Sequence, residues 1–212
     1  MKKDNYELLV EQWRIKSLSF DYKERYEALG LPGYSEGDFL PIECFGRLYE
    51  IDRRDGTIRD VLQPERKPHF YTAMAIYHLF YFSKERPVNS GRFVPFREVK
   101  RCAPFDPAFK KLILRPFARA FEGKKELLIE TGEKLGYKRI KYSDAGFEAK
   151  AFECMPVQIL FWDGDEEFPA QANILFDENI IDFTHEETVV VIGEAAVRSL
   201  VEGAGLNWND YC

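Results

Sequence analysis

Apolar side chains recur every three to four residues in several stretches of the chain, which is the spacing of one face of an α-helix. Gly30 and Pro32 end the second of these stretches, and Gly136 ends the fourth, as is common at helix C-termini. Thr184, followed by Glu187, is typical of a capping box at the start of the last stretch. The predicted helices span residues 5–19, 21–29, 106–121, 124–135 and 185–202.

Shorter segments of alternating or continuous apolar character predict strands between these helices. Gly46 divides the first segment into two strands, and the Asp55-Gly56 pair is typical of the tight turn before a third strand. An acidic turn between Trp162 and Phe168 joins the last two candidates and predicts a hairpin. The predicted strands lie within residues 39–51, 57–62, 92–99, 149–154, 157–162 and 168–176.

Residues 70–82 are apolar on every side, and nine of them are Phe, Tyr, Met, Ile or Leu. A helix without a polar face is a buried helix, so we expect this one at the centre of the fold. The pattern therefore predicts an α+β fold, with antiparallel sheet or sheets, a buried central aromatic helix and peripheral helices. We expect a single globular domain over residues 1–212, with residues 1–30 as an N-terminal helical segment packed on it.

Composition narrows the class of protein. Hydrophobic residues make up 45% and charged residues 31%, which argues against disorder. The most apolar stretch is much shorter than the ~20 residues of a membrane-spanning helix, so no membrane association is expected. The four cysteines lie far apart, which predicts a reducing cytoplasm and no sequence-local zinc or iron–sulfur site. They are Cys44, Cys102, Cys154 and Cys212.

Charge is distributed unevenly along the chain. Residues 65–142 carry 18 basic and 8 acidic groups, whereas residues 143–212 carry 2 basic and 15 acidic groups. The favoured interpretation is that these two parts attract each other within one fold, and the alternative is self-association or steering of a charged ligand. The pI of about 5.3 argues against nucleic-acid binding.

The predicted helix over residues 106–121 combines an apolar side with a basic side. Pro116 predicts a kink or a split into two shorter helices, and Leu112 is expected to face inward. Three basic residues four apart form a stripe on the outer side: Lys111, Arg115 and Arg119. This stripe, with Arg97 upstream, could meet phosphates or an acidic partner, although we expect it to face the acidic C-terminal third or solvent.

Four residues are candidates for ligand binding, and no catalytic residue or metal site is assigned. His78 in the aromatic helix could ligate a metal or haem iron or move protons, or it could be a satisfied core residue. Asp163 could hold a hard cation or belong to a solvated turn, and Asp177 could enter a site or cap a turn. Arg97 could bind an anionic ligand. Nucleophile and phosphate-loop motifs are absent from the sequence.

Several short motifs carry a family resemblance. They are Val157-Gln158-Ile159-Leu160-Phe161-Trp162-Asp163, Phe168-Pro169-Ala170, Ile174-Leu175-Phe176-Asp177, Phe39-Leu40-Pro41, Tyr49-Glu50-Ile51-Asp52 and Tyr77-His78-Leu79-Phe80. Over roughly residues 25–202 the chain resembles the domain-of-unknown-function 3786 family of anaerobic bacteria and archaea. The resemblance implies a setting in anaerobic redox or one-carbon metabolism, because some relatives look like fusions with a four-cysteine iron–sulfur module.

Three hypotheses for function follow. The first is a binding or accessory module that acts with a metabolic redox enzyme, which the missing catalytic motifs favour. The second is a protein that binds a small molecule or tetrapyrrole-type ligand, motivated by the aromatic residues and His78. The third is a metal-assisted hydrolase, which requires Asp163, Asp165, Asp177 or His185 to converge on one point. The cofactor, the oligomeric state and the choice between a protein partner and a small-molecule ligand remain open.

Overall fold

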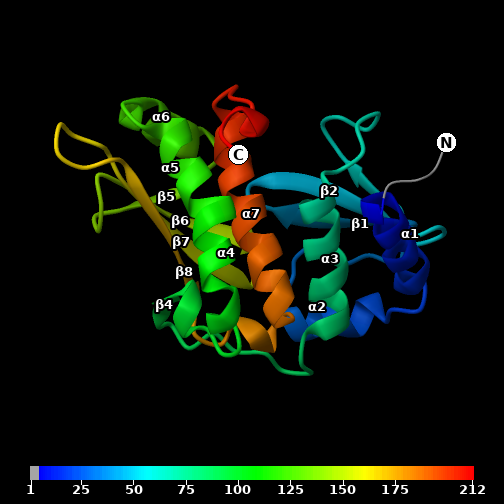
Figure 1. The fold of residues 1–212 in the computed structure, drawn as a ribbon. Coiled ribbons are helices and arrows are strands. Elements are labelled where there is room, and N and C mark those ends of the chain that lie inside the picture. Colours follow the sequence, from blue (N-terminus) through cyan, green and yellow to red (C-terminus); the bar gives the residue numbers. More distant parts are fainter. Residues whose placement is uncertain (1–4) are drawn as a thin grey trace.

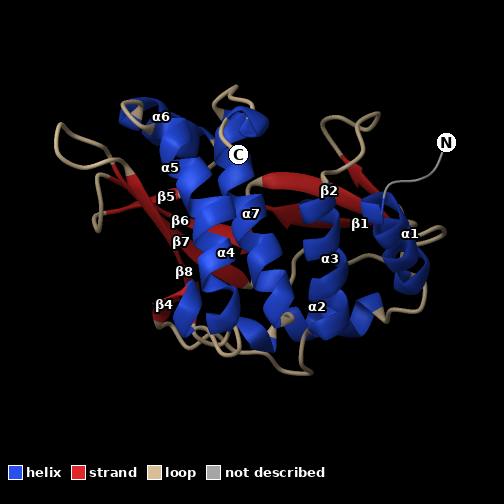
Figure 2. Ribbon diagram, in the orientation of Figure 1, coloured by secondary structure: helices blue, strands red, loops and turns tan. Residues whose placement is uncertain are grey.

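Two antiparallel sheets lie behind a layer of helices in the computed structural model, which describes residues 5–212 (Figure 1). The three-stranded sheet has the order β1-β2-β3, formed by Phe39–Cys44, Arg47–Asp52 and Ile58–Asp60. The five-stranded sheet has the order β4-β8-β7-β6-β5. Its strands are β4 Phe93–Pro95, β5 Lys138–Ile140, β6 Ala145–Phe152, β7 Met155–Trp162 and β8 Gln171–Asp177. The predicted α+β class is confirmed (Figure 2).

The helices form a layer that covers both sheets. Its members are α1 Asn5–Ser17, α2 Tyr22–Leu29, α3 Phe70–Phe82, α4 Asp106–Phe109, α5 Arg115–Phe121, α6 Lys125–Lys134 and α7 Glu186–Gly203. The aromatic helix α3 has the predicted bounds, is buried over most of its length, and packs between α1 and α7 above β1. The first four residues of the predicted N-terminal segment lie outside the described residues. Within residues 5–212, no helix combines the length and apolar character needed to cross a bilayer.

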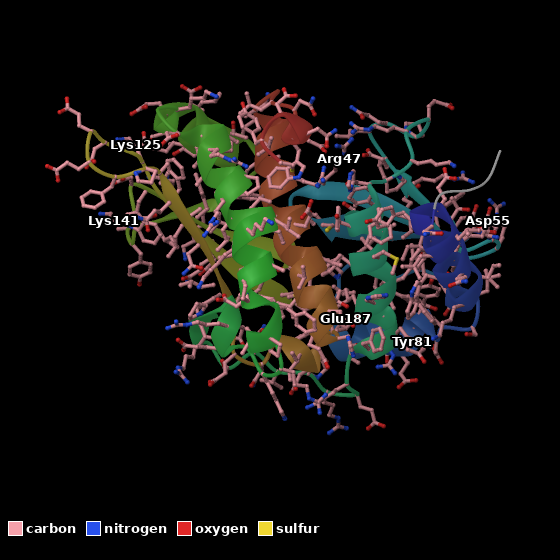
Figure 3. All side chains as sticks on the ribbon, in the orientation of Figure 1. Arg47, Asp55, Tyr81, Lys125, Lys141 and Glu187 are labelled. Carbon is pink, nitrogen blue, oxygen red and sulfur yellow. The ribbon has the colours of Figure 1, made fainter. Side chains whose placement is uncertain are left out.

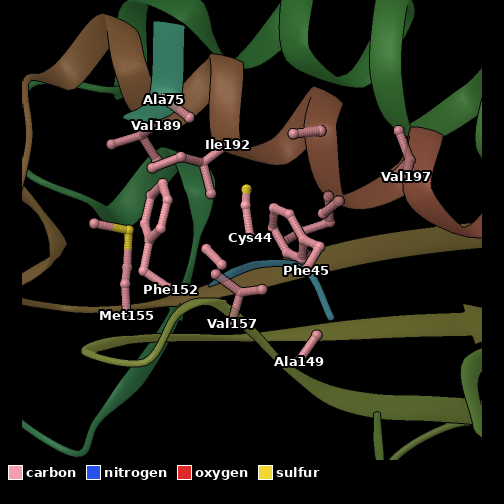
Figure 4. Close-up of a cluster of buried hydrophobic side chains, with 14 of the residues drawn as sticks. Cys44, Phe45, Ala75, Ala149, Phe152, Met155, Val157, Val189, Ile192 and Val197 are labelled. Atoms are coloured by element: carbon pink, nitrogen blue, oxygen red, sulfur yellow. The ribbon is translucent and has the colours of Figure 1, made fainter. Parts of the chain in front are cut away.

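The turn between β1 and β2 joins the two sheets. Phe45 adopts φ +49°, and its N–H donates to the carbonyl of Lys150 in β6 at 3.1 Å. Figure 4 shows Cys44 and Phe45 enclosed between α7 and the β6–β7 hairpin, where they belong to one hydrophobic core shared by both sheets. The helix α7 contacts both α3 and α5, so it links the two halves of the helical layer. Hydrophobic periodicity did not distinguish this role from that of the other helices.

The segment that contains Pro116 is split, as predicted, but by a π turn over Lys110–Leu114 and not by a break. The N–H of Arg115 donates to the carbonyl of Lys110, and this wider turn accommodates a proline that has no N–H to donate. The expectation that Leu112 faces inward is wrong, because its side chain is 59% exposed. The π turn adds one residue to the helical turn and rotates the buried face, so that Leu114 is buried.

The other differences between the predicted and observed elements concern where elements begin, and one short strand that was not predicted. The N-cap of α7 is His185, whose Nδ1 accepts from the N–H of Glu187 at 3.3 Å, and not Thr184. The strand β6 begins at Ala145, earlier than predicted, and β8 begins at Gln171, later than predicted. The three-residue edge strand β5 was not predicted, because so short a segment shows no clear period.

Candidate functional site

A groove of about 970 Å³ runs between β8 and the segment formed by α4, the π turn and α5. These elements are labelled on the left side of Figure 1. The strand side of the groove is formed by the beginning of β8, by Pro95 at the end of β4 and by Trp162 at the end of β7. Of the three cavities described here, it is the largest.

The strand side of the groove exists because β4 is short. Pairing between β4 and β8 is restricted to residues 93–95 and 175–177. The ladder ends at Pro95 because residues 96–98 turn away into a 3-10 helix. The part of β8 from residue 171 to 174 therefore pairs with β7 on one side and has no strand on the other, where residues 171–173 line the groove.

The helix side of the groove is strongly basic. Five basic side chains line it: Arg97, Lys110, Lys111, Arg115 and Arg119. Lys110 pairs with Asp106 at 2.7 Å, and Arg119 donates to the carbonyl of Tyr211. Within the described residues, the side chains of Lys111 and Arg115 form no ion pair or hydrogen bond. Because Asp106 is the sole acidic side chain among the residues that line it, the groove carries a surplus of positive charge.

The predicted attraction between the basic middle and the acidic end of the chain does occur, but at other positions. Five pairs join these two parts: Arg66 with Glu202 at 3.6 Å, Lys84 with Asp182 at 2.6 Å, Arg92 with Glu178 at 2.7 Å, Arg101 with Glu186 at 3.9 Å and Lys138 with Glu148 at 3.9 Å. The basic stripe, which is formed by Lys111 in the π turn and by Arg115 and Arg119 in α5, takes no part in this pairing. Lys111 and Arg115 therefore remain available to an anionic group that does not belong to this chain.

The groove also offers apolar surface. The Trp162 ring is 38% exposed, and Leu112, Pro169, Ala170 and Ala172 line the same groove. Tryptophan combined with basic side chains is typical of binding surfaces, since the ring supplies contact area and the cations supply orientation. The groove can therefore bind an extended ligand that carries both negative and apolar groups.

His78 belongs to α3 and lies away from the groove, where its side chain contacts α1 and α7. Its Nδ1 is 2.7 Å from the hydroxyl of Thr188, whereas its buried Nε2 has no partner among the described residues. The rings of Trp13 and Phe82 pack on the imidazole, with centroids 4.3 Å and 5.2 Å away. Burial, aided by the nearby His185, lowers the pKa of His78 to about 4, so the ring is neutral at pH 7. A metal or tetrapyrrole could reach Nε2 only if the atoms that bury this nitrogen moved away.

The two candidate aspartates hold turns together. Asp177 is 2% exposed, and its carboxylate accepts from the N–H groups of Ser90, Gly91 and Asn179. Asp163 accepts from Gly123 and Gly164, and thereby fixes the start of the acidic turn. These contacts match the turn and cap interpretation of both residues.

The remaining residues of the hydrolase hypothesis are also used locally. The N–H groups of Glu167 and Phe168 lower the pKa of Asp165, and His185 caps α7. In the part of the chain that the structure describes, no three His, Cys, Asp or Glu side chains form a group that could hold a metal ion. Convergence on one point, which that hypothesis requires, is not observed among these residues.

None of the four cysteines is an activated thiol. Burial raises the pKa of Cys102 and of Cys154 to about 12, and it also raises the pKa of Cys44. Cys212 lines the groove, and its pKa is raised too, chiefly by partial burial. The groove therefore combines binding groups with no thiolate nucleophile.

A second cavity of about 240 Å³ lies between β2, the first turn of α3 and the C-terminal half of α7. We call it the polar cleft. Arg47, labelled in Figure 3, contacts the buried carboxylate of Asp60 there. Arg198, which also lines the cleft, donates from Nε to Glu194 at 2.8 Å. Charge in the polar cleft is therefore largely compensated within the chain.

Of the four candidate residues, Arg97 alone lines the groove, whereas His78, Asp163 and Asp177 line none of the three described cavities. The basic stripe was visible in the sequence, because its spacing of four residues places it on one side of a helix. Trp162 and residues 171–173 were not singled out. Their contribution depends on which strand edge stays unpaired, and no local pattern reports that.

Comparison with known proteins gives a family but no characterised relative. No curated protein and no solved structure matches the chain. One family model, described as a domain of unknown function (DUF3786), matches residues 21–199, close to the range over which the short motifs showed a resemblance. The match covers most of the chain, including both sheets, α3 and most of α7. The chain therefore belongs to the DUF3786 family.

Proposed function

We propose that this protein is a binding module that docks an acidic segment of a partner protein in the basic groove. The observation that carries the proposal is the environment of Lys111 and Arg115. Both line the largest described cavity, and neither has a carboxylate partner within the described residues, although other basic residues of the same part of the chain are paired. Exposed cations without counter-charge contribute little to stability, and they guide association with negatively charged partners.

The expected class of partner and the expected compartment rest on other observations. The family resemblance favours a partner in anaerobic redox or one-carbon metabolism, so the protein would act as an accessory module to an enzyme of that kind. The cysteines are free and scattered, which favours the cytoplasm. These statements about partner and compartment are parts of the proposal.

An acidic protein segment suits the groove better than a nucleic acid does. Glu122 lies at one end, where its carboxylate accepts from the N–H of Ala170, and the acidic turn that starts at Asp163 follows close by. These carboxylates would repel a continuous phosphate backbone, whereas a protein segment can place uncharged residues next to them.

The proposal is tested with a short blocked peptide in which glutamate alternates with valine, labelled for fluorescence anisotropy. The double variant Lys111→Glu with Arg115→Glu should weaken binding at least about tenfold, because two attractive contacts become repulsive. The matched control is Lys138→Glu with Lys141→Glu, which changes the net charge equally. Lys138 lies on β5, at the opposite edge of the sheet, and Lys141 is on the loop that follows (Figure 3). The control should change affinity less than about twofold.

Two results would overturn the proposal. Equal losses in both double variants would mean that net charge, and not the groove, drives binding. Tighter binding of a single-stranded oligonucleotide of equal charge would identify a nucleic-acid site instead. A visible absorption band in protein purified without oxygen would support the tetrapyrrole hypothesis, and His78→Ala would then be expected to remove that band.

A further inference from the structure

We infer that the acidic segment binds by adding an extra strand to the five-stranded sheet, along residues 171–174 of β8. This inference rests on the proposed function and specifies how the groove recognises its partner. The free part of β8 forms one side of the groove, and the basic stripe forms the other. An extended segment in this position would continue the line of β4 beyond Pro95.

The free backbone groups of β8 point into the groove. Residues of an antiparallel strand bond alternately to the neighbour on one side and to the neighbour on the other. Glu178 donates its N–H to the carbonyl of Arg92 at 2.9 Å, so the even-numbered residues of β8 face the side of β4. The N–H of Ala170 fits this alternation, because it bonds a side chain, that of Glu122, and not β7.

Two backbone N–H groups within residues 171–174 of β8 point away from β7, and one of them is already hydrogen-bonded while the other is not. The N–H of Ile174 is covered by the side chain of its own neighbour, Asn173, at 2.9 Å. Such a local bond satisfies the donor, and a ligand carbonyl can replace it at little net cost. The N–H of Ala172 forms no hydrogen bond within the described residues. An edge with free donors is a template for another strand, and here no helix or loop pairs with it.

The side chains around this edge specify the class of partner. Ala172 and Ile174 lie on the same sheet face as Phe176, whose ring packs on Phe109 of α4. An added strand would therefore direct every second side chain toward the helix side, where Lys111 and Arg115 lie. Acidic residues at alternate positions would meet these cations, and the others would lie on the opposite sheet face with Trp162.

A second copy of this chain is the competing occupant, because the turn at residues 163–167 is acidic. The described contacts do not favour it. Asp163 already accepts from Gly123 and Gly164, and Asp165 accepts from Glu167 and Phe168. Two of the four carboxylates in this turn are therefore engaged within the chain. Sedimentation of the protein alone, at the concentrations used for binding, distinguishes the two occupants.

The test uses the same blocked glutamate–valine peptide in three forms, unmodified, N-methylated on every glutamate, or N-methylated on every valine. In an added strand, alternate N–H groups face β8, so one methylated form should bind at least about tenfold more weakly and the other nearly as well as the parent. Charge is equal in all three peptides. Ala172→Pro should also weaken binding about tenfold, because it removes the open donor, whereas Ala172→Val should not.

Each outcome has a distinct meaning. If the unmodified peptide does not bind, the proposed function fails. If all three peptides bind equally well, the groove binds by charge alone, and strand addition is overturned while the proposed function stands. If both methylated forms lose affinity equally, strand geometry is also overturned. Self-association that Lys111→Glu abolishes would identify a second copy as the occupant. Should Ala172→Pro fail to fold, the methylated peptides still decide.

Discussion

The basic groove and the polar cleft both contain several arginine and lysine side chains, but they differ in what surrounds these cations. In the polar cleft all three arginines are paired: Arg47 contacts Asp60, Arg66 is 3.6 Å from Glu202, and the third pairs with a carboxylate of its own helix. Lys67 is the one basic side chain of the cleft without a carboxylate partner within the described residues. In the groove, Lys111 and Arg115 have no carboxylate partner within the described residues.

This difference shows that the number of basic residues does not identify a binding surface. Paired charges hold elements of the fold together, and removing one partner leaves a desolvated charge behind. Unpaired exposed charges stabilise the fold very little, and two of them in one groove are the basis of the binding proposed above. Substitutions in the groove should therefore change the free energy of unfolding less than substitutions in the half of the molecule that holds the polar cleft.

The largest effect is expected for Asp60 in the polar cleft. Its side chain is 4% exposed, one oxygen contacts Arg47, and the other accepts from the N–H groups of Leu62 and Gln63. We expect Asp60→Ala to lower the free energy of unfolding by about 3 kcal/mol, because the variant leaves Arg47 unpaired and two donors unsatisfied. Urea denaturation measures this change. Asp60→Asn can retain the two backbone contacts and should cost about half as much.

A smaller effect should appear on acidification, through the neutral and partly buried His78. Its pKa is lowered to about 4 in the folded protein, whereas an unfolded histidine titrates near 6.5. As the pH falls from 7 toward 4, the unfolded chain gains a proton that the folded protein resists, so stability decreases. We expect about 2 kcal/mol of this loss to disappear in His78→Asn.

Comparing urea denaturation of the two proteins at pH 7 and at pH 5 isolates this contribution. The comparison is necessary because burial also lowers the pKa of His69. Parallel loss of stability in the wild type and in His78→Asn would show that the imidazole takes up protons freely, contrary to its packed environment.

An effect of about 1 kcal/mol is expected for Arg198→Lys. The guanidinium of Arg198 bonds Glu194 and lies 5.2 Å from the ring centroids of both Tyr71 and Trp208, and an ammonium group cannot reproduce this planar contact. The matched control is Arg66→Lys, because Arg66 is 59% exposed and its carboxylate partner is 3.6 Å away. If Arg66→Lys lowers the free energy of unfolding as much as Arg198→Lys does, planar stacking contributes nothing to stability.

The smallest change is expected in the groove itself. Lys111→Ala and Arg115→Ala should each alter the free energy of unfolding by less than about 0.5 kcal/mol, because both side chains are exposed and unpaired within the described residues. The same variants should weaken binding of the acidic peptide, which anisotropy measures. A loss of 2 kcal/mol or more would show that these residues stabilise the fold, and would remove the contrast between groove and cleft.

Much of the architecture was visible in local patterns. The aromatic helix over residues 70–82 was predicted with its observed bounds, because a helix with no polar face has one stable location, in the interior. The Gly30 end of α2 and the Gly46 turn followed from the left-handed backbone that glycine adopts most easily. The π turn before Pro116 was not visible, since a proline in a helical pattern predicts a kink or a split without specifying the kind of turn.

The candidate site was likewise predictable in part. Side-chain spacing was enough to predict an α+β fold and to place Lys111, Arg115 and Arg119 on one side of a helix. That this side faces a free edge of β8, while other basic residues meet carboxylates far away in the sequence, became visible in the folded chain alone. Pairing between distant segments depends on the packing of the whole chain, and no local period encodes it.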